Sequence, residues 1–204
     1  MLRNDGRAMA FMRGLTFPGG QQPVLRGAGV YLRYPAITDF AQWSQLRTTN
    51  RDFLAPWEPV WSVDELTKSA FRRRLKRYQR DTRQDTAYPF FVFNAANDAL
   101  MGGCTLSNVR RGVAQCCTLG YWIGEQFARQ GHMSDAVKCV IPFIFGTLGL
   151  HRIEAACLSH NEPSKNLLIK AGFRQEGIAR RYLLIHGAWQ DHVQFALLAE
   201  DVAS

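Results

Sequence analysis

Apolar residues recur along residues 25–204 at two spacings, one typical of strands and one typical of helices. Short apolar or alternating runs bounded by turn residues predict strands at residues 30–34, 89–95, 100–109, 113–123, 152–158, 174–185 and 189–198. Apolar residues three and four positions apart predict helices that begin near Thr38 or Asp39, at the capping box Ser62–Glu65, at Gly131 and at Asn161. Pro142 lies inside the third of these helices and predicts a kink there.

The order of these elements, βααβββαβαββ, is typical of a single α/β domain. It predicts a central mixed, mostly antiparallel sheet of about seven strands flanked by about four helices over residues 25–204. Residues 1–24 contain four glycines and two prolines without a hydrophobic period, which predicts a mobile N-terminal extension. No apolar run approaches the roughly 18–20 residues that a membrane span needs, so we expect no membrane partner and a cytoplasmic location.

The cysteines and histidines argue against a disulfide framework and against a metal site. The five cysteines are odd in number, include one adjacent pair and show no C-x-x-C spacing. We therefore expect them to be small core residues. The five histidines form no H-E-x-x-H motif and no closely spaced pair, so we expect no metal.

A formal net charge of +8 indicates an anionic partner, either a polyanionic cofactor or an RNA-rich particle. Much of this charge falls on the second predicted helix. Its basic residues are Lys68, Arg72, Arg73, Arg74, Lys76, Arg77, Arg80 and Arg83. Two interpretations stay open, a solvated helix face or a surface that docks on a ribosome.

Residues 120–137 hold the most informative local pattern. A strand that ends in Tyr121, Trp122 and Ile123 leads through a tight basic loop into a helix at Gly131. Such a connection directs several backbone N–H groups and the positive end of the helix dipole at one place, which suits a diphosphate. The expected contacts are loop residues Gln126 and Gln130 and the backbone amides of Arg129, Gly131, His132 and Met133. An ordinary strand–turn–helix connection is the alternative.

Together with the segment Asn161–Phe173, this loop resembles the acyl-CoA-binding core of the GNAT N-acetyltransferase superfamily. The family pattern Gln/Arg-x-x-Gly-x-Gly/Ala is matched by Gln126 and Gly131, whereas Arg129 stands where the first glycine is usual. Arg129 either restricts the loop or reaches the phosphate oxygens itself.

The resemblance implies acetyl-CoA as the acyl donor and direct attack by an amine, without a covalent enzyme intermediate. It places Tyr121, Trp122 and Ile123 against the pantetheine arm, with their N–H groups as candidates for the oxyanion contact. It also places Asn161 at the cofactor arm, although a helix-capping role for Asn161 is an equal alternative.

The family's usual general acid is a tyrosine in the pattern Asn-x-x-Ala-x-x-Leu-Tyr. Here Asn161, Ser164 and Leu167 occupy that pattern, and Leu168 replaces the tyrosine. A leucine cannot protonate a thiolate, so Ser164, Tyr182 or a water molecule remains to do so.

From about Leu25 onward the chain also resembles a narrower group, the RimJ/RimL-type N-terminal acetyltransferases of ribosomal proteins. The segments that carry this resemblance are PWEP (residues 56–59), LHRIEA (150–155), HNEPS (160–164), GFRQEG (172–177) and RYLLIHGAWQDHV (181–193). The resemblance implies that the PWEP loop and the last hairpin lie near the acceptor amine.

The resemblance therefore offers three candidate general bases. They are Glu58, Glu154 and Asp191, the last with His192 beside it. Glu154 can instead be a charged residue on a solvated face, and Asp191 a turn partner that orients His192.

The resemblance implies an enzyme that acetylates the N-terminal α-amine of a protein, of the type that acts on the alanine terminus of a ribosomal protein. Two alternatives stay open: a small-molecule amine such as an antibiotic or a polyamine as acceptor, and a non-catalytic module of the same fold that binds an RNA-rich partner. Both a monomer and a homodimer fit a domain of this size.

Overall fold

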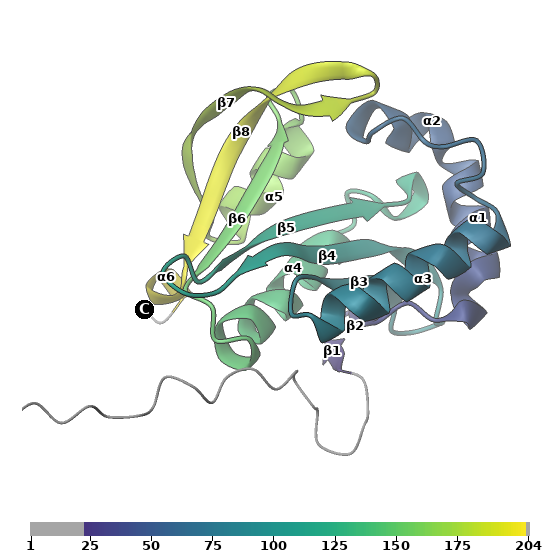
Figure 1. Cartoon of the computed structure of the whole chain (residues 1–204), viewed down its shortest axis with the longest axis horizontal. Helices are drawn as coiled ribbons and strands as arrows, with labels where there is room; N and C mark the ends of the chain where they lie inside the picture. The colour runs from purple at the N-terminus through teal and green to yellow at the C-terminus, as the bar shows by residue number, and fades with distance from the viewer. Residues whose placement is uncertain (1–22, 203–204) are drawn as a thin grey trace, which may run out of the picture.

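Eight strands form one sheet in the computed structural model, which describes residues 23–202 (Figure 1). The sheet order is β1-β2-β3-β4-β5-β6-β8-β7, and β5 and β6 are parallel while the other neighbours are antiparallel. The strands are β1 (Val24–Arg26), β2 (Val30–Arg33), β3 (Tyr88–Asn94), β4 (Leu100–Arg110), β5 (Cys116–Ile123), β6 (Arg152–Leu158), β7 (Arg174–Ile185) and β8 (Ala188–Leu198). The mixed, mostly antiparallel sheet is confirmed, with β1 as the strand that the sequence did not predict.

Helices cover the two faces of the sheet unequally. On one face lie α1 (Phe40–Thr49), α2 (Arg51–Leu54) and α3 (Lys68–Arg83), and on the other lie α4 (His132–Pro142) and α5 (Glu162–Lys170), while α6 (Ala199–Val202) follows β8. Short 3-10 turns occupy Ile37–Asp39, Ala55–Trp57 and Glu125–Phe127. Residues 23–202 thus hold six α-helices instead of about four, and α2 and α6 have only four residues each.

Strand β3 shows why this layering fits the sequence. Its segment YPFFVFN is buried almost throughout, because both of its faces are covered. Phe90 and Val92 pack into the larger core beneath α4 and α5, whereas Phe91 and Phe93 pack into a second core under α1 and α3. Strand β7 has mostly exposed side chains, in keeping with an edge strand that has one neighbour in the sheet.

The predicted start of the basic helix at the capping box Ser62–Glu65 is wrong. The Ser62 hydroxyl forms hydrogen bonds with the side chains of Asp64 and Glu65, at 3.0 and 3.4 Å, instead of capping a helix. Helix α3 begins one turn later, where Oγ1 of Thr67 accepts a hydrogen bond from the backbone N–H of Ala70 at 3.2 Å. Side-chain pairing has taken the place of the predicted cap.

Two other predicted boundaries also change. The strand predicted from residue 113 begins at Cys116, because Gly112 and Gln115 adopt left-handed φ angles of +63° and +40° in the preceding turn. The disturbance predicted at Pro142 takes the form of a π-helical turn, Phe143–Thr147, closed by a 2.9 Å hydrogen bond from Leu148 N to Phe143 O. A proline removes one helical hydrogen bond, and the wider turn follows directly after it.

Residues 1–22 of the predicted N-terminal extension lie outside the described residues, and Val24 already pairs with Arg33 in the sheet. The prediction that the cysteines are core residues is confirmed for four of them. Cys104, Cys116, Cys117 and Cys157 are buried, and Cys139 is half-buried; none of the five forms a disulfide. Over residues 23–202, no helix is both long and apolar enough to cross a membrane.

Candidate active site

The parallel strands β5 and β6 pair along only part of their length. Residues Cys116–Leu119 of β5 pair with Arg152–Ala155 of β6, and the pairing ends there. Residues 120–123 of β5 keep β4 as a neighbour but have no partner on the β6 side within the described chain. The backbone of Tyr121, Trp122 and Ile123 therefore offers an unpaired edge at an opening in the sheet, where an extended ligand can form main-chain hydrogen bonds.

The loop after β5 presents the start of α4 to the same region. Gly131 is the N-cap residue, with a left-handed φ of +86° and no side-chain cap. The first backbone N–H groups of a helix have no intrahelical acceptor, so those of His132 and Met133 are available to an anion. Arg129 adopts a left-handed φ of +60°, although it is not a glycine. The Gln130 side chain closes the loop by donating to the Gln126 carbonyl oxygen at 2.7 Å.

Helix α1 fixes this loop through a residue that the sequence did not single out. The buried Asn50 accepts a hydrogen bond from the backbone N–H of Glu125 at 2.6 Å and donates to the Leu46 carbonyl oxygen at 2.8 Å. A Cβ atom at Gly124 would lie only 2.7 Å from a methyl group of Leu46, so a larger residue there would displace the Leu46 side chain. No local pattern marks Asn50, because its partner lies 75 positions away.

Helix α5 borders the opening with the second predicted element. Oδ1 of Asn161 accepts a hydrogen bond from the backbone N–H of Ser164 at 3.1 Å, which confirms the capping role. The Asn161 amide nitrogen is thereby left for another acceptor. The Ser164 hydroxyl oxygen lies 2.7 Å from the Tyr121 hydroxyl. Leu168 lies in the core and is only 1% exposed.

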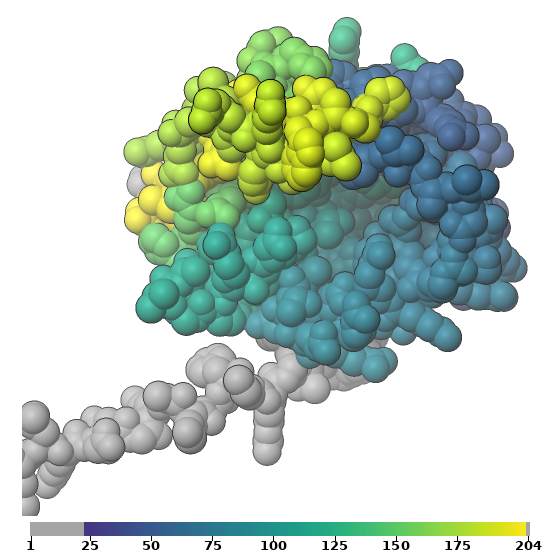
Figure 2. Space-filling view, turned by 45° about the horizontal axis from the view of Figure 1, so that its top comes forward, coloured from purple at the N-terminus to yellow at the C-terminus, as the bar shows by residue number. Residues whose placement is uncertain are grey.

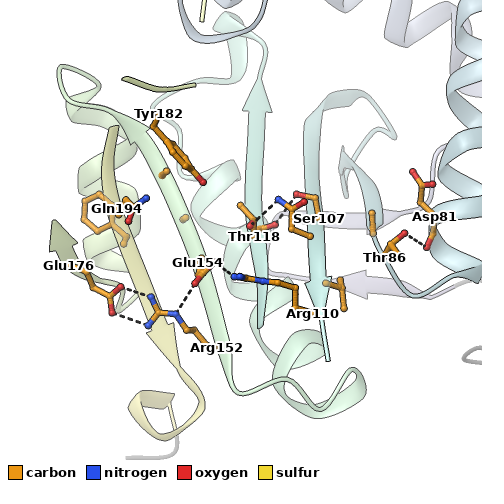
Figure 3. Close-up of a pocket in the computed structure, with 16 residues that line it drawn as sticks. Asp81, Thr86, Ser107, Arg110, Thr118, Arg152, Glu154, Glu176, Tyr182 and Gln194 are labelled. Atoms are coloured by element: carbon orange, nitrogen blue, oxygen red, sulfur yellow. Dashed lines mark hydrogen bonds and ion pairs between the residues drawn. The ribbon is translucent and has the colours of Figure 1, made fainter. Parts of the chain in front are cut away.

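A cleft of about 780 Å³ lies between α3 and the β7–β8 hairpin. Figure 2 shows it as a hollow below the hairpin. Its lining includes Asp81 and Thr86 at the α3 side and Tyr182 and Gln194 at the hairpin side (Figure 3). Thr118 of β5 and residues 154–156 of β6 lie at its base, next to the part of β5 that β6 leaves unpaired. The cleft thus lies on one face of the sheet. The start of α4 and helix α5 lie on the other face.

Glu154 lies at the base of the cleft within an ion-pair network (Figure 3). Its carboxylate oxygens accept hydrogen bonds from Arg110 at 2.7 Å and from Arg152 at 3.1 Å. Arg152 also pairs with Glu176, at 2.9 Å for one of the two contacts. The hydrogen bond to Arg152 lowers the pKa of Glu176, and Glu176 in turn raises the pKa of Arg152. The base of the cleft therefore carries both positive and negative side chains.

Tyr182 projects into the cleft from a bulge in β7. Three residues, 180–182, lie opposite the single residue Asp191 of β8. Arg181 has a left-handed φ of +47°, and its backbone N–H donates to Oδ1 of Asp191 at 2.8 Å. The Tyr182 ring meets the buried His192 edge-on, with 5.7 Å between ring centroids. Asp191 therefore holds the bulge that presents Tyr182, and it is not part of the cleft lining.

Glu58 lies outside the cleft lining, in a separate cluster with Arg47 and Trp61. Both of its carboxylate oxygens accept hydrogen bonds from Arg47, at 2.7 and 2.6 Å, and one also accepts from Trp61 at 2.7 Å. The buried Arg47 guanidinium is stacked between the rings of Trp61 and Trp122, 4.1 and 4.9 Å from their centroids. Both oxygens of the Glu58 carboxylate are thus occupied by donors from this chain. The backbone carbonyl of Glu58 also accepts from the hairpin tip, at His186 N.

Comparison with known proteins identifies the family of this chain. Residues 30–174 match the acetyltransferase (GNAT) domain family. The chain belongs to the GNAT acetyltransferase family. This membership confirms the predicted fold, the predicted acyltransferase activity and acetyl-CoA as the acyl donor.

Three relatives of this GNAT chain are informative. It is 36% identical over 178 residues to the probable N-acetyltransferase YjcK of Bacillus subtilis, covering 87% of this chain and 98% of that protein. It is 39% identical over 152 residues to the ribosomal protein uS5-alanine N-acetyltransferase of Escherichia coli, covering 74% of this chain and 78% of that protein. Among solved structures it is similar to Mycobacterium smegmatis RimJ in complex with CoA-disulfide, with a TM-score of 0.83, 31% identity, and coverage of 90% and 89%.

In this GNAT chain the predicted site residues fall into three groups. The cofactor-side residues, together with Ser164, gather around the opening and the start of α4. Glu154 and Tyr182 line the cleft on the other face, whereas Glu58 and Asp191 hold neighbouring loops. Their catalytic roles stay predictions. No group of three or more His, Cys, Asp or Glu side chains able to hold a metal occurs in the described part of the chain.

Proposed function

We propose that this acetyltransferase works in the cytoplasm and transfers the acetyl group of acetyl-CoA to the N-terminal α-amine of a protein. The proposed acceptor is a ribosomal protein whose first residue is alanine. The amine attacks the thioester directly. The observation that carries the proposal is the access from two faces: the phosphate loop and α5 lie on one face of the open strands, and the cleft lies on the other. The likeness to the Escherichia coli uS5-alanine enzyme supports the choice of acceptor.

The cleft supports a polypeptide acceptor over a small polycation. Its lining carries the carboxylates of Asp81, Glu154 and Glu176, but Arg110 and Arg152 lie among them, so the cleft is not strongly acidic. A polyamine or an aminoglycoside would gain most from an acidic cleft. A chain terminus with one ammonium group and several backbone amides suits a long cleft of mixed charge.

Within this proposal, the acetyl carbonyl lies at the opening, where backbone N–H groups of residues 121–123 stabilise the oxyanion. Glu154 acts on the amine from the cleft side, through an ordered water, because it is the one carboxylate among the three predicted bases that lines the cleft. Tyr182 borders the same space and orients the acceptor.

We further propose that the outer face of α3 docks on the RNA of a ribosome. Lys68, Arg72, Lys76 and Arg83 are exposed and form no ion pair with any residue between 23 and 202. The same helix contributes Asp81 to the cleft, so docking would bring a nearby protein terminus to the acceptor entrance. Binding to ribosomes should weaken as the salt concentration rises.

The acceptor is tested by incubating the full chain with acetyl-CoA and identifying products by mass spectrometry. The panel holds peptides that begin with Ala, Ser or Met, the same peptides with a blocked α-amine and a free lysine, spermidine, and an aminoglycoside. We expect acetylation of the α-amine, with the alanine peptide preferred. Product mass is the readout because the five cysteines would disturb a thiol assay.

Three other results would contradict the proposal in different ways. Acetylation of only the blocked lysine peptide would make the chain a side-chain acetyltransferase. Acetylation of spermidine or the aminoglycoside alone would indicate a small-molecule enzyme. Tight CoA binding with no product from any acceptor would favour the non-catalytic module.

A further inference from the structure

The place of the missing tyrosine acid is closed to the donor. Leu168 is only 1% exposed and packs in the core with residues of α4 and β6. A side chain at that position of α5 contributes to packing and cannot act on the donor sulfur. Any group that acts on the sulfur must therefore come from another part of the opening.

A different tyrosine reaches the start of α5 from the sheet. Tyr121 lies on the unpaired part of β5 and packs against the larger core together with Ile123. Its hydroxyl oxygen lies 2.7 Å from Oγ of Ser164 and 3.5 Å from the Ser164 carbonyl oxygen. The pair thus joins the open edge of β5 to the first turn of α5, beside the expected path of the pantetheine arm.

Either hydroxyl of this pair can be the donor, and both have further partners. Burial raises the pKa of the Tyr121 phenol, so this group keeps its proton at neutral pH. Ser164 also interacts with the thiol of Cys157 on β6; burial raises the pKa of that thiol, and the hydrogen bond from Ser164 partly offsets the rise. When the phenol donates to Oγ of Ser164, the Ser164 hydrogen is left for another acceptor, either the Cys157 sulfur or a donor sulfur at the opening.

We propose that Tyr121 is a positioning residue for the acetyl-CoA thioester: its hydroxyl donates to Oγ of Ser164 and so turns the Ser164 hydrogen toward the donor sulfur. The inference rests on the proposed function of the chain as an acetyltransferase of amines. Tyr121 and Ser164 act as a unit in place of the tyrosine acid that Leu168 replaces.

The step that this pair assists is the departure of CoA. The acceptor nitrogen forms a bond to the acetyl carbon and loses a proton on the cleft side. The carbon–sulfur bond breaks, and the electron pair stays on the sulfur, which later takes a proton from water. A hydrogen bond from Ser164 that is aimed at this atom stabilises the negative charge as it develops, and it needs no reorientation at that moment.

The test is the kinetics of Tyr121→Phe, Ser164→Ala and the double variant on the best acceptor of the unsubstituted enzyme. Each single variant should lower kcat about 10- to 100-fold while the KM for acetyl-CoA stays within about twofold. The double variant should be no slower than the slower single variant, because the two groups form one unit. Ser164→Thr, which keeps the hydroxyl, should retain most of the turnover.

Tyr34→Phe is the matched control. It removes the hydroxyl of another half-buried tyrosine, a hydroxyl that is itself buried and has no hydrogen-bond partner among the described residues. This variant should keep the turnover of the unsubstituted enzyme, and all variants should keep its melting temperature.

Two outcomes would overturn the inference. One is normal kcat in Tyr121→Phe, and the other is losses that multiply in the double variant together with a raised KM for acetyl-CoA, as expected of separate packing defects. Turnover by the unsubstituted enzyme tests the proposed function by itself. Its absence would remove both proposals, whereas its presence with an active Tyr121→Phe variant would remove only this one.

Discussion

At the scale of single residues, backbone conformation and hydrogen bonding decide what a side chain can do. Arg129 takes the left-handed conformation that the family usually assigns to glycine, with φ at +60°. A residue with a Cβ atom pays about 1–2 kcal/mol for this conformation. Since the loop keeps its form despite that cost, restriction of the loop is not the main effect of Arg129. We infer that its side chain contributes to binding the diphosphate.

Replacing Arg129 by glycine separates these two effects. In Arg129→Gly, the free energy of unfolding should change by less than about 1 kcal/mol, because relief of the left-handed conformation offsets the entropy of glycine. The affinity for CoA should fall about tenfold, since a charge-assisted hydrogen bond to phosphate is worth roughly 1.5–3 kcal/mol. Isothermal titration calorimetry and thermal melting measure both, with Arg129→Lys as the control that keeps the charge. Unchanged affinity would leave the diphosphate to the backbone amides alone.

At the scale of elements, irregularities in regular structure present the side chains of the cleft. The sequence predicted residues 174–185 as one strand, and the structure agrees on its ends. Within it, however, residues 180–182 leave the pairing pattern, and Asp191 holds them through the backbone of Arg181. Bulges of this kind redirect a side chain, here Tyr182 toward the cleft. Asp191 is thus better described as a support of the bulge than as a base.

Two substitutions of Asp191 distinguish these roles. Asp191→Ala removes the acceptor for Arg181 N–H and should lower turnover about 5- to 12-fold, the equivalent of one lost hydrogen bond of about 1–1.5 kcal/mol. Asp191→Asn keeps an oxygen at Oδ1 and should stay close to the unsubstituted enzyme. Steady-state kinetics with the alanine peptide measure both variants. If Asp191→Asn were as slow as Asp191→Ala, the carboxylate itself would be needed and Asp191 would return as a base.

At the scale of the whole molecule, the opening between β5 and β6 gives the sheet two working faces (Figure 1). The phosphate loop and α5 approach the opening from one side, and the cleft approaches it from the other. The basic helix α3 contributes Asp81 to the wall of that cleft, so much of the positive charge of the chain lies beside the acceptor entrance. This placement favours an anionic partner that carries the acceptor.

The docking surface is tested by replacing Arg72 and Lys76 with glutamine. The pair Arg26→Gln and Lys170→Gln is the control, because it lowers the net charge equally at exposed positions on β1 and α5. Cosedimentation with ribosomes at several salt concentrations should show weaker binding of the α3 variant and a salt slope lower by about one for each removed phosphate contact. Peptide acetylation should be unchanged. Equal binding by the two variants would mean that α3 is a solvated face.

The sequence by itself determined the elements whose causes are local. The strand–loop–helix of residues 120–137 and the Asn161 cap depend on residues a few positions apart, and the structure contains both. Even local reasoning was wrong at Ser62–Glu65, because their side chains bind one another and, from α3, Arg73 and Arg74. Competing partners of this kind are not visible in a capping pattern.

Only the tertiary structure decided which residues share a site. The length of β5 that β6 leaves unpaired follows from how both strands pack on α4 and α5, and no residue pattern records it. The fold also brings Tyr121 to Ser164, 43 positions away, and the turn after α1 brings Glu58 to Arg47. Periodicity reports the neighbours of a residue along one element, whereas hydrogen-bond partners across the fold depend on the path of the whole chain.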